Sequence, residues 1–305
     1  IDLLTLNVNL DIRSHYIYGR YRKLERGIPQ TRWPCRSCKG RGCAKCSGTG
    51  MQYPNSVQAL IGDPLLDLFE SSDHAFHGMG REDIDVRCLG RGRPFIIELK
   101  NPRKRKVPMQ EIMDAINKAA EGKIEVDSMR DSQRSEVVRV KDTPAEKSYR
   151  ICFTASPLKN EEETNLSSLK KAELEELCVQ RGIKKGGKKA DLIERLQTAH
   201  VPDAESITKI LLGMEGTVLE QRTPKRVAHR RADKVRKRRV MQVSNVKVET
   251  NDGIPEVQVD LRCESGTYVK ETVHGDGGRT VPSVAGLLQS ECKVLWLDVA
   301  DIHAD

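Results

Sequence analysis

A short run of acidic residues lies in a segment rich in glycine and arginine, GREDIDVRCLGRGR, at positions 80–93. The carboxylates belong to Glu82, Asp83 and Asp85. Nearby arginines favour the charged form of a carboxylate, and an ionised aspartate can act as a nucleophile or a general base. Taken alone, the segment is better explained as a glycine-rich turn with ion pairs, so the rest of the chain has to decide.

A different chemistry is open to the same region. Asp85, followed by Glu98 and Lys100, matches the D…E-x-K pattern of magnesium-dependent nucleases. In those enzymes two carboxylates hold the metal and the lysine polarises the phosphate. The pattern is short and commonly arises by chance, so a metal-dependent nuclease is kept as an alternative.

Four of the nine cysteines are crowded into CRSCKGRGCAKC, as two C-x-x-C pairs. Each pair directs two thiolates at one point, and four thiolates suit tetrahedral zinc. Such crowding favours a metal in a reducing compartment over a disulfide framework. The short spacer leaves open whether one closed site forms or the second pair shares its zinc with a partner. The sequence predicts structural zinc bound by Cys35, Cys38, Cys43 and Cys46.

The chain is basic, with a formal net charge of +8 over 305 residues and a pI near 9.0. Ten lysines and arginines but only one acid, Asp233, lie between Arg222 and Arg239. A polyanion that neutralises this charge density is the favoured explanation, and a solvated face is the alternative. No apolar run approaches the length of a membrane span. The residues expected to bind RNA are Arg81, Arg226, Arg230, Arg231, Lys237 and Arg238.

Apolar periodicity divides the chain into strands and helices. Helices are predicted over 56–71, where Pro64 is expected to interrupt the pattern, and over 109–122. The turn NDG predicts a hairpin between two of the strands. Strands are predicted over 1–24, 94–99, 123–131, 147–156, 238–250, 255–263 and 292–302.

A helix–turn–helix unit interrupts this pattern at 163–200. Its motif L-x-x-L-x-x-x-E-L, followed by R-G-I-x-x-x-G-x-K-x-D-L-I-E-R-L, resembles that of a SAP domain. SAP domains bind nucleic acid through helix N-termini and lysines, and a protein-interaction hairpin is the alternative. The lysines at the turn are Lys184, Lys185, Lys188 and Lys189. The apolar stripe consists of Leu169, Leu174, Leu177, Ile183, Leu192, Ile193 and Leu196.

Four separated blocks of the sequence stand out together. They are YGRYRKLERGIPQTRWPC (18–35), GREDIDVRCLGRGRPFIIELKNP (80–102), QRTPKRVAHRRADKVRKRR (221–239) and SGTYVKETVHGDGGRTVPSVAGLL (265–288). In type and order they resemble blocks of pseudouridine synthases of the Pus-ten type, an archaeal and eukaryotic family that acts on the T loop of tRNA. The resemblance implies an α+β fold with a mixed, largely antiparallel sheet and flanking helices. It also implies conversion of uridine to pseudouridine at tRNA positions 54 and 55, without a cofactor for catalysis.

The resemblance assigns roles to individual residues. Asp83 matches the essential aspartate of the family, and Asp85 is the runner-up. Tyr149 matches the tyrosine that stacks on the target base. Tyr268 and Lys270 match the tyrosine and the basic residue of a block in the TruB branch, and Lys270 is expected to pair with Asp83.

A second group of residues is implied around the uracil. Leu287 or Leu288 is expected to form an apolar wall under the base. His274, Asp276 and Arg279 belong to the same family block and are expected to organise the site.

The expected domain organisation follows from these blocks. Residues 1–56 form a strand region with the zinc knuckle at 34–50, residues 57–158 and 203–305 form the catalytic domain, and 163–200 is the insert. Relative to the family, an N-terminal RNA-binding domain is expected to be missing. An intracellular location in the nucleus, the cytoplasm or both is expected, and the insert suggests a eukaryotic source. A non-catalytic zinc protein that binds RNA is the third hypothesis.

Overall fold

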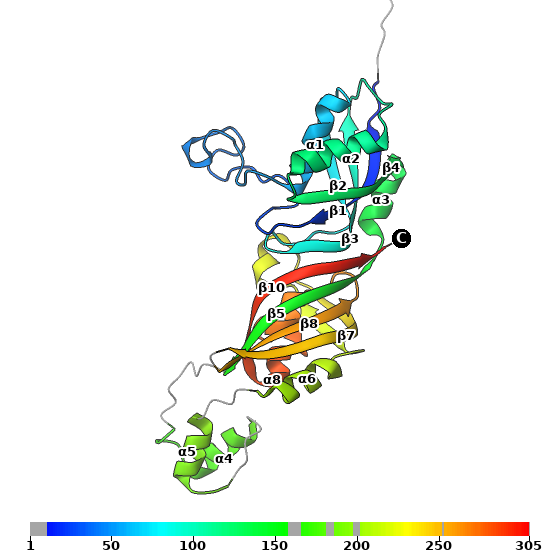
Figure 1. The fold of residues 1–305 in the computed structure, drawn as a ribbon. Coiled ribbons are helices and arrows are strands. Elements are labelled where there is room, and N and C mark those ends of the chain that lie inside the picture. The colour runs from blue at the N-terminus through cyan, green and yellow to red at the C-terminus, as the bar shows by residue number, and fades with distance from the viewer. Residues whose placement is uncertain (1–10, 158–165, 181–185, 198–201, 252, 305) are drawn as a thin grey trace, which may run out of the picture. The chain divides into compact units, whose positions relative to one another are not determined.

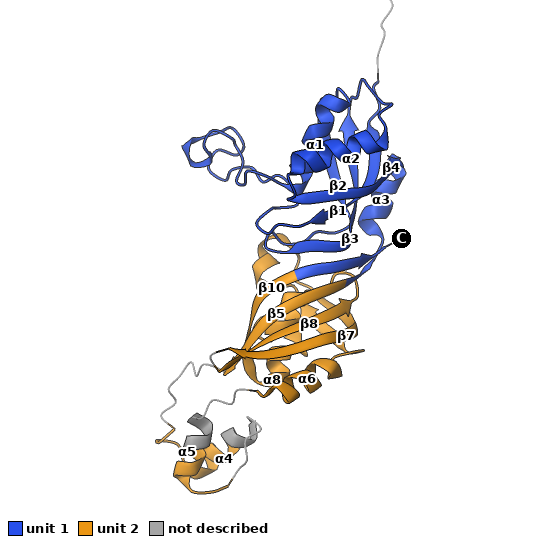
Figure 2. Cartoon of the chain, viewed as in Figure 1, with its two compact units in different colours: residues 1–147, 298–305 blue, residues 148–297 orange. Residues whose placement is uncertain are grey.

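The computed structural model describes residues 11–157, 166–180, 186–197, 202–251 and 253–304 (Figure 1). The chain forms two compact units, coloured separately in Figure 2. Unit 1 comprises residues 1–147 and 298–305, and unit 2 comprises residues 148–297. This division falls inside the predicted catalytic domain, and the domain boundaries drawn from the sequence stay a prediction.

The sheet of unit 1 is built on β3 (Arg87–Lys100). β1 (His15–Lys23) lies antiparallel to β3, and β4 (Ile124–Ser132) lies antiparallel to β1. On the opposite side of β3, β2 (Asp73–Gly78) pairs antiparallel with its second half. Asp298 and Val299 of β10 (Ser290–His303) pair parallel with the start of β3, opposite Arg87 and Cys88.

Two helices of unit 1, α1 (Val57–Leu68) and α2 (Met109–Ala120), share a hydrophobic core with β1, β3 and β4. The Ser56 hydroxyl caps α1 by accepting a hydrogen bond from the Ala59 amide at 3.0 Å. The helix runs through Pro64, so the expected interruption is wrong. Buried Leu60, Ile61 and Leu65 on both sides of the proline hold the helix in place.

The sequence patterns missed two elements of unit 1. The strand expected at 94–99 is the second half of β3, and β2 beside it was not anticipated because its residues, DHAFHG, show no clean apolar alternation. The helix α3 (Arg134–Asp142) was also missed, because Val140 is its only fully buried residue.

Unit 2 contains a largely antiparallel sheet with the strand order β10-β5-β8-β7-β6-β9. The predicted hairpin is confirmed, since Asn251 of β7 pairs with Ile254 of β8. Helix α6 packs on β7 and on α8, and α8 also packs on α7. These elements are β5 (Glu146–Pro157), β6 (Val218–Arg222), β7 (Val235–Asn251), β8 (Ile254–Cys263), β9 (Thr280–Val281), α6 (Ala204–Gly213), α7 (Val269–His274) and α8 (Val284–Leu288). The α+β fold class and the largely antiparallel sheet are confirmed.

The insert contains the two expected helices, α4 (Lys171–Gln180) and α5 (Lys189–Gln197). Leu166, Leu174 and Leu192 form its buried core, and Leu169 and Ile193 pack against them. Other expected members of the stripe and of the turn lie outside the described residues or side chains, namely Leu177, Ile183, Lys184, Lys185 and Leu196.

Candidate active site and metal cluster

The loop between β2 and β3 carries the acidic run of the sequence. Gly80 turns the chain with a positive φ of 71°, a conformation that glycine adopts without steric cost. Asp83 is half-buried and Asp85 is exposed, whereas Glu82 is only 5% exposed. Neighbouring carboxylates of one short loop therefore occupy very different surroundings.

Glu82 points into the unit and meets a buried cation. Its Oε2 lies 2.8 Å from Nε of Arg93, and both side chains are almost fully buried. The Tyr21 hydroxyl lies 2.9 and 3.0 Å from the two carboxylate oxygens of Glu82. Burial, and then the charge of Glu82, raise the pKa of Tyr21 well above its usual value. Glu82 is thus a structural anchor and not a surface acid.

The backbone carbonyls of the loop are bonded from several directions. Nζ of Lys23 donates to the carbonyls of Asp83 at 3.2 Å and Ile84 at 3.1 Å. The Gln30 amide donates to the Gly80 carbonyl at 3.0 Å, and Arg26 donates to the Asp85 carbonyl at 2.7 Å. The loop that carries Asp83 is therefore fixed along most of its length.

The structure gives the residues of the nuclease alternative other roles. Glu98 accepts hydrogen bonds from Tyr16 at 3.1 Å and binds His77 at 3.0 Å. Burial acts to raise the pKa of Glu98, but hydrogen bonds from His77, Ser14 and Tyr16 outweigh it and leave the pKa below its ordinary value. Lys100 forms an exposed ion pair with Asp73 at 2.7 Å. This arrangement does not favour a nuclease site.

The residues expected to surround the base lie in unit 2. Tyr149 is on β5 and is 8% exposed. Tyr268 and Lys270 are half-buried at the start of α7, where Gln221 accepts a hydrogen bond from the Tyr268 amide at 2.8 Å and donates one to its carbonyl at 3.0 Å. Because Asp83 belongs to the other unit, its pairing with Lys270 stays a prediction.

The two candidate wall leucines differ in exposure. Leu287 on α8 is 45% exposed, whereas Leu288 is 6% exposed and belongs to the core. Leu287 is therefore the one that offers an apolar surface to a ligand.

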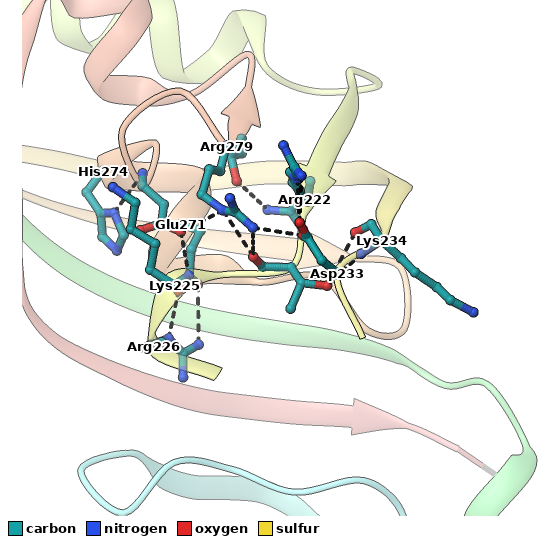
Figure 3. A network of polar contacts seen from close by, with 12 residues as sticks. Arg222, Lys225, Arg226, Asp233, Lys234, Glu271, His274 and Arg279 are labelled. Carbon is teal, nitrogen blue, oxygen red and sulfur yellow. Dashed lines mark hydrogen bonds and ion pairs between the residues drawn. The ribbon is translucent and has the colours of Figure 1, made fainter. Parts of the chain in front are cut away.

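The basic segment is organised by a few acids, as Figure 3 shows. The Asp233 carboxylate forms ion pairs with the guanidinium groups of Arg222 at 2.6 Å and Arg279 at 2.9 Å (Figure 3). Arg279 also donates to the carbonyl of Thr223 at 2.6 Å. These contacts tie the start of the segment and Asp233 in its middle to Arg279, which immediately precedes β9. A role of Arg279 in organising the site stays a prediction.

Further contacts hold the middle of this segment. Arg226 pairs at 2.6 Å with Glu271, which is 1% exposed. The amide of Lys225 donates to the Asp276 carboxylate at 2.9 Å, and the amide of Asp276 donates to Nδ1 of His274 at 3.1 Å. His274 and Asp276 thus support the segment, as Arg279 does.

The predicted RNA-binding residues fall into two groups. Arg226 serves the buried Glu271, Arg231 donates to the Tyr268 hydroxyl at 3.2 Å, and Lys237 lies 3.3 Å from Glu220. Arg81 and Arg230 are exposed, and Arg238 is half-buried. The segment is therefore both a cationic surface and part of the frame around Tyr268.

The four clustered cysteines form one compact group, with all Sγ atoms within 4.8 Å of one another. The distances are 3.9 Å for Cys35–Cys43, 3.8 Å for Cys38–Cys46 and 3.7 Å for Cys43–Cys46. Zinc–sulfur bonds of about 2.3 Å in a tetrahedron place sulfurs about 3.8 Å apart, so the geometry fits one closed metal site. A single site does not need a partner's thiolates.

The backbone of this cysteine cluster also suits thiolates. Amides of Gly42, Cys43 and Gly50 lie 3.2 Å from cysteine sulfurs. Gly42 has a positive φ of 87°, and a Cβ there would meet the Gly48 carbonyl oxygen at 2.6 Å. The glycines between the cysteines therefore allow the tight turns that bring the two pairs together.

Sequence reasoning missed the polar groups beneath the Asp83 loop. Lys23 is fully buried. The alternation that places Ile17 and Tyr21 inward also places position 23 inward, and this was the signal that could have identified it. No periodicity marked Glu82 as buried, because Glu82 lies in a loop and its burial depends on Arg93 of β3. Among the described residues, no helix is long and apolar enough to cross a membrane.

Comparisons with known proteins agree with the resemblance. The family model described as "Pus10, C-terminal" matches residues 16–188 and 180–303. A tRNA pseudouridine synthase Pus10 from Methanothrix thermoacetophila is 41% identical over 296 residues, which are 97% of this chain and 55% of that protein. Another from Methanocaldococcus jannaschii is 40% identical, over 99% of this chain and 56% of the relative. The chain thus spans about half the length of these relatives.

A solved Cbf5-Nop10-Gar1 complex shows a distant likeness, with a TM-score of 0.36 and 14% identity over 79% of this chain and 44% of that one. This overlap is too low to support a statement about function. The two named relatives are archaeal, so they give no support to a eukaryotic source. The match of the family model over most of the sequence shows that the chain belongs to the Pus10 C-terminal family.

Proposed function

We propose that this chain is the catalytic part of a tRNA pseudouridine synthase that isomerises uridines 54 and 55 in the T loop. Relatives that carry the name tRNA pseudouridine synthase match almost the whole chain. The placement of Asp83 carries the proposal. Asp83 is half-buried, and the backbone of its loop accepts hydrogen bonds from Lys23 and from the side-chain amide of Gln30. A carboxylate on a fixed loop is what an in-place reaction on one nucleotide needs.

The reaction breaks the N1–C1′ bond, turns the uracil and forms a C5–C1′ bond. The proton on C5 is lost and N1 gains one, so no external reactant is needed. The Asp83 carboxylate acts by adding to C6 of uracil, by attacking C1′ or by removing the C2′ proton. In each route the nucleotide has to leave the stacked loop to reach the aspartate.

Residues of unit 2 would receive the extruded nucleotide. Tyr149 would stack on the uracil, Leu287 would cover its other side, and Lys270 would pair with Asp83. The exposed apolar side chain of Leu287 supports this role. Tyr268, whose hydroxyl receives Arg231, would connect the base pocket to the cationic segment.

The cations of residues 222–239 would bind tRNA phosphates. Arg230 and Lys237 are exposed there, and Arg81 is exposed beside Asp83. The insert would add a second nucleic-acid contact, because Lys188 and Lys189 are exposed at the start of α5. Zinc held by the cysteine cluster would be structural and would take no part in the isomerisation.

The test is to incubate the 305-residue chain with an unmodified tRNA transcript, with magnesium or with EDTA. Pseudouridine is mapped by carbodiimide treatment and reverse-transcription stops. We expect stops at positions 54 and 55 under both conditions, because no metal takes part in the chemistry. Strand cuts that need magnesium would support the nuclease instead. Bound but unchanged tRNA would leave a zinc and RNA-binding protein and overturn the proposal.

A further inference from the structure

Five buried polar side chains lie beneath the Asp83 loop within unit 1. Four of them contact one another, and Lys23 binds backbone carbonyls of the same loop. We call these five side chains the anchor cluster. Burying charged groups is costly unless each is paired or hydrogen-bonded. Its members are Tyr21 (0% exposed), Lys23 (0%), Gln30 (7%), Glu82 (5%) and Arg93 (1%).

Three members of the anchor cluster bind the backbone of the loop. Lys23 donates to the carbonyls of Asp83 and Ile84 and, at 2.9 Å, to that of Ile28. Gln30 donates to the Gly80 carbonyl at 3.0 Å, and Arg93 donates to the Met79 carbonyl at 2.7 Å. The cluster therefore holds the loop on both sides of the aspartate.

The other contacts fix the residue immediately before Asp83. Glu82 is held by Arg93 at 2.8 Å and by the Tyr21 hydroxyl, which also accepts a hydrogen bond from Gln30 at 3.0 Å. Burial lowers the pKa of Lys23, while the charge of Glu82 acts to raise it. The Glu82 side chain and the Asp83 carbonyl are both held by these contacts. Few rotatable bonds therefore remain between the anchor cluster and the Asp83 carboxylate.

We infer that the anchor cluster is the device that positions Asp83 for the reaction, with Lys23 and Glu82 as its principal positioning residues. The inference rests on the proposed function. A misplacement of about 1 Å at a reacting group costs on the order of 100-fold in rate. Residues that fix the Asp83 peptide without touching the substrate therefore act on the chemical step and not on tRNA affinity.

The first test compares Lys23→Met with Arg20→Met. Arg20 is a matched control, because it is also a buried cation on β1. Among the described residues its hydrogen bonds go to backbone carbonyls, those of Arg91, Gly92, Ile302 and Ala304. Under single-turnover conditions with saturating tRNA, Lys23→Met should lower the rate of pseudouridine formation by about 100-fold. Arg20→Met should change the rate per folded molecule by less than about threefold, even where it lowers the unfolding temperature as much.

The second test uses a milder change, in case Lys23→Met does not fold. Tyr21→Phe removes the hydroxyl that donates to Glu82. Tyr16→Phe is the control, because Tyr16 lies on the same strand, β1, and its hydroxyl donates to Glu98. Only Tyr21→Phe should slow the reaction, by roughly tenfold. The tRNA dissociation constant should stay within about twofold of the wild-type value for both variants.

Hydrogen exchange of the backbone amides gives a readout that needs no activity. The Val86 amide donates to the Asp83 carbonyl at 3.1 Å, and the Gly27 amide donates to that of Ile84 at 2.9 Å. Lys23→Met and Tyr21→Phe should speed exchange at these amides, and the control variants should not. Equal losses of rate in cluster and control variants, or unchanged exchange, would overturn the inference. A wild-type chain that forms no pseudouridine would instead overturn the proposed function, while the exchange data would still test the anchoring.

Discussion

At the scale of single residues, neighbouring acidic residues take different roles according to their surroundings. Glu82 and Asp83 are neighbours, yet Glu82 forms a buried ion pair with Arg93, whereas Asp83 is half-buried. In unit 2, Glu271 is likewise buried against an arginine, Arg226. Buried charges of this kind make single substitutions informative, because a lost partner leaves an uncompensated charge.

Arg226→Ala should destabilise the protein even though Arg226 lies in a segment assigned to RNA. The change leaves the carboxylate of Glu271 buried without its cation, and we expect a loss of about 2 kcal/mol of unfolding free energy. Arg230→Ala, an exposed arginine in the same segment, is the control and should change stability by less than about 0.5 kcal/mol. Thermal unfolding measures both, and equal stability of the two variants would contradict this role.

Lys147 should give the protein a stability that rises with pH. Burial, and then the charge of Arg93, lower the pKa of Lys147 to about 8 from 10.5. Between these values the unfolded chain binds more protons than the folded one, so this group's contribution to the unfolding free energy increases with pH. Below pH 8 the penalty of burying the ammonium is fully present.

Lys147→Met isolates this effect. Burial raises the pKa of the Cys88 thiol to about 12, so buried thiols of this kind lower the unfolding free energy at high pH. They are present in the wild type and in the variant, so their effect cancels in the comparison. From pH 7 to pH 10 the wild type should gain about 2–3 kcal/mol relative to the variant. Denaturant unfolding at several pH values measures it, and parallel curves for the two proteins would show that Lys147 keeps an ordinary pKa.

At the scale of elements, sequence periodicity located the regular strands and helices and missed those defined by tertiary pairing. The alternation in β1 and β8 and the helical spacing in α2 identified those elements in advance. The two-residue β9 exists only because Thr280 and Val281 pair with β6. The cysteine spacing predicted a metal, but closure of one site depended on glycine turns that local patterns do not specify.

The cysteine cluster should bind one zinc ion per chain. Elemental analysis of the purified chain should give a one-to-one ratio, and Cys35→Ser should lower it because one of four thiolates is lost. Cys88→Ser is the control, since Cys88 is buried in β3 and is not part of the cluster. Half a zinc per chain would indicate a site shared between two molecules.

At the scale of the whole molecule, positive charge gathers in one segment that also helps to hold the fold of unit 2. The net charge of +8 is concentrated in the segment 222–239, where ten lysines and arginines accompany one acid. From the sequence, this segment was predicted to bind phosphate, but its second role in framing Tyr268 required the structure. Similarly, Asp83 was assigned from the family resemblance and stays a prediction, whereas the anchor cluster became visible only in the structure, because it combines residues of β1, β3 and the loops beside them.

Binding of tRNA should weaken steeply with salt, because cations that contact phosphates release counterions. Arg230→Ala should reduce the slope of log Kd against log salt concentration by about 1 and should leave the pseudouridine position unchanged. Lys141→Ala, which removes an exposed charge at the end of α3, is the matched control and should leave the slope unaltered. Equal slopes for wild type and Arg230→Ala would remove Arg230 from the RNA surface.

The central claim is that Asp83 performs the isomerisation, and one measurement tests it most directly. Wild type, Asp83→Asn and Asp85→Asn are compared for pseudouridine formation at saturating tRNA, with tRNA affinity measured in parallel. The account predicts that Asp83→Asn binds tRNA normally and forms no pseudouridine, while Asp85→Asn stays active. Loss of activity with Asp85→Asn alone would contradict it and assign the reaction to the exposed neighbour.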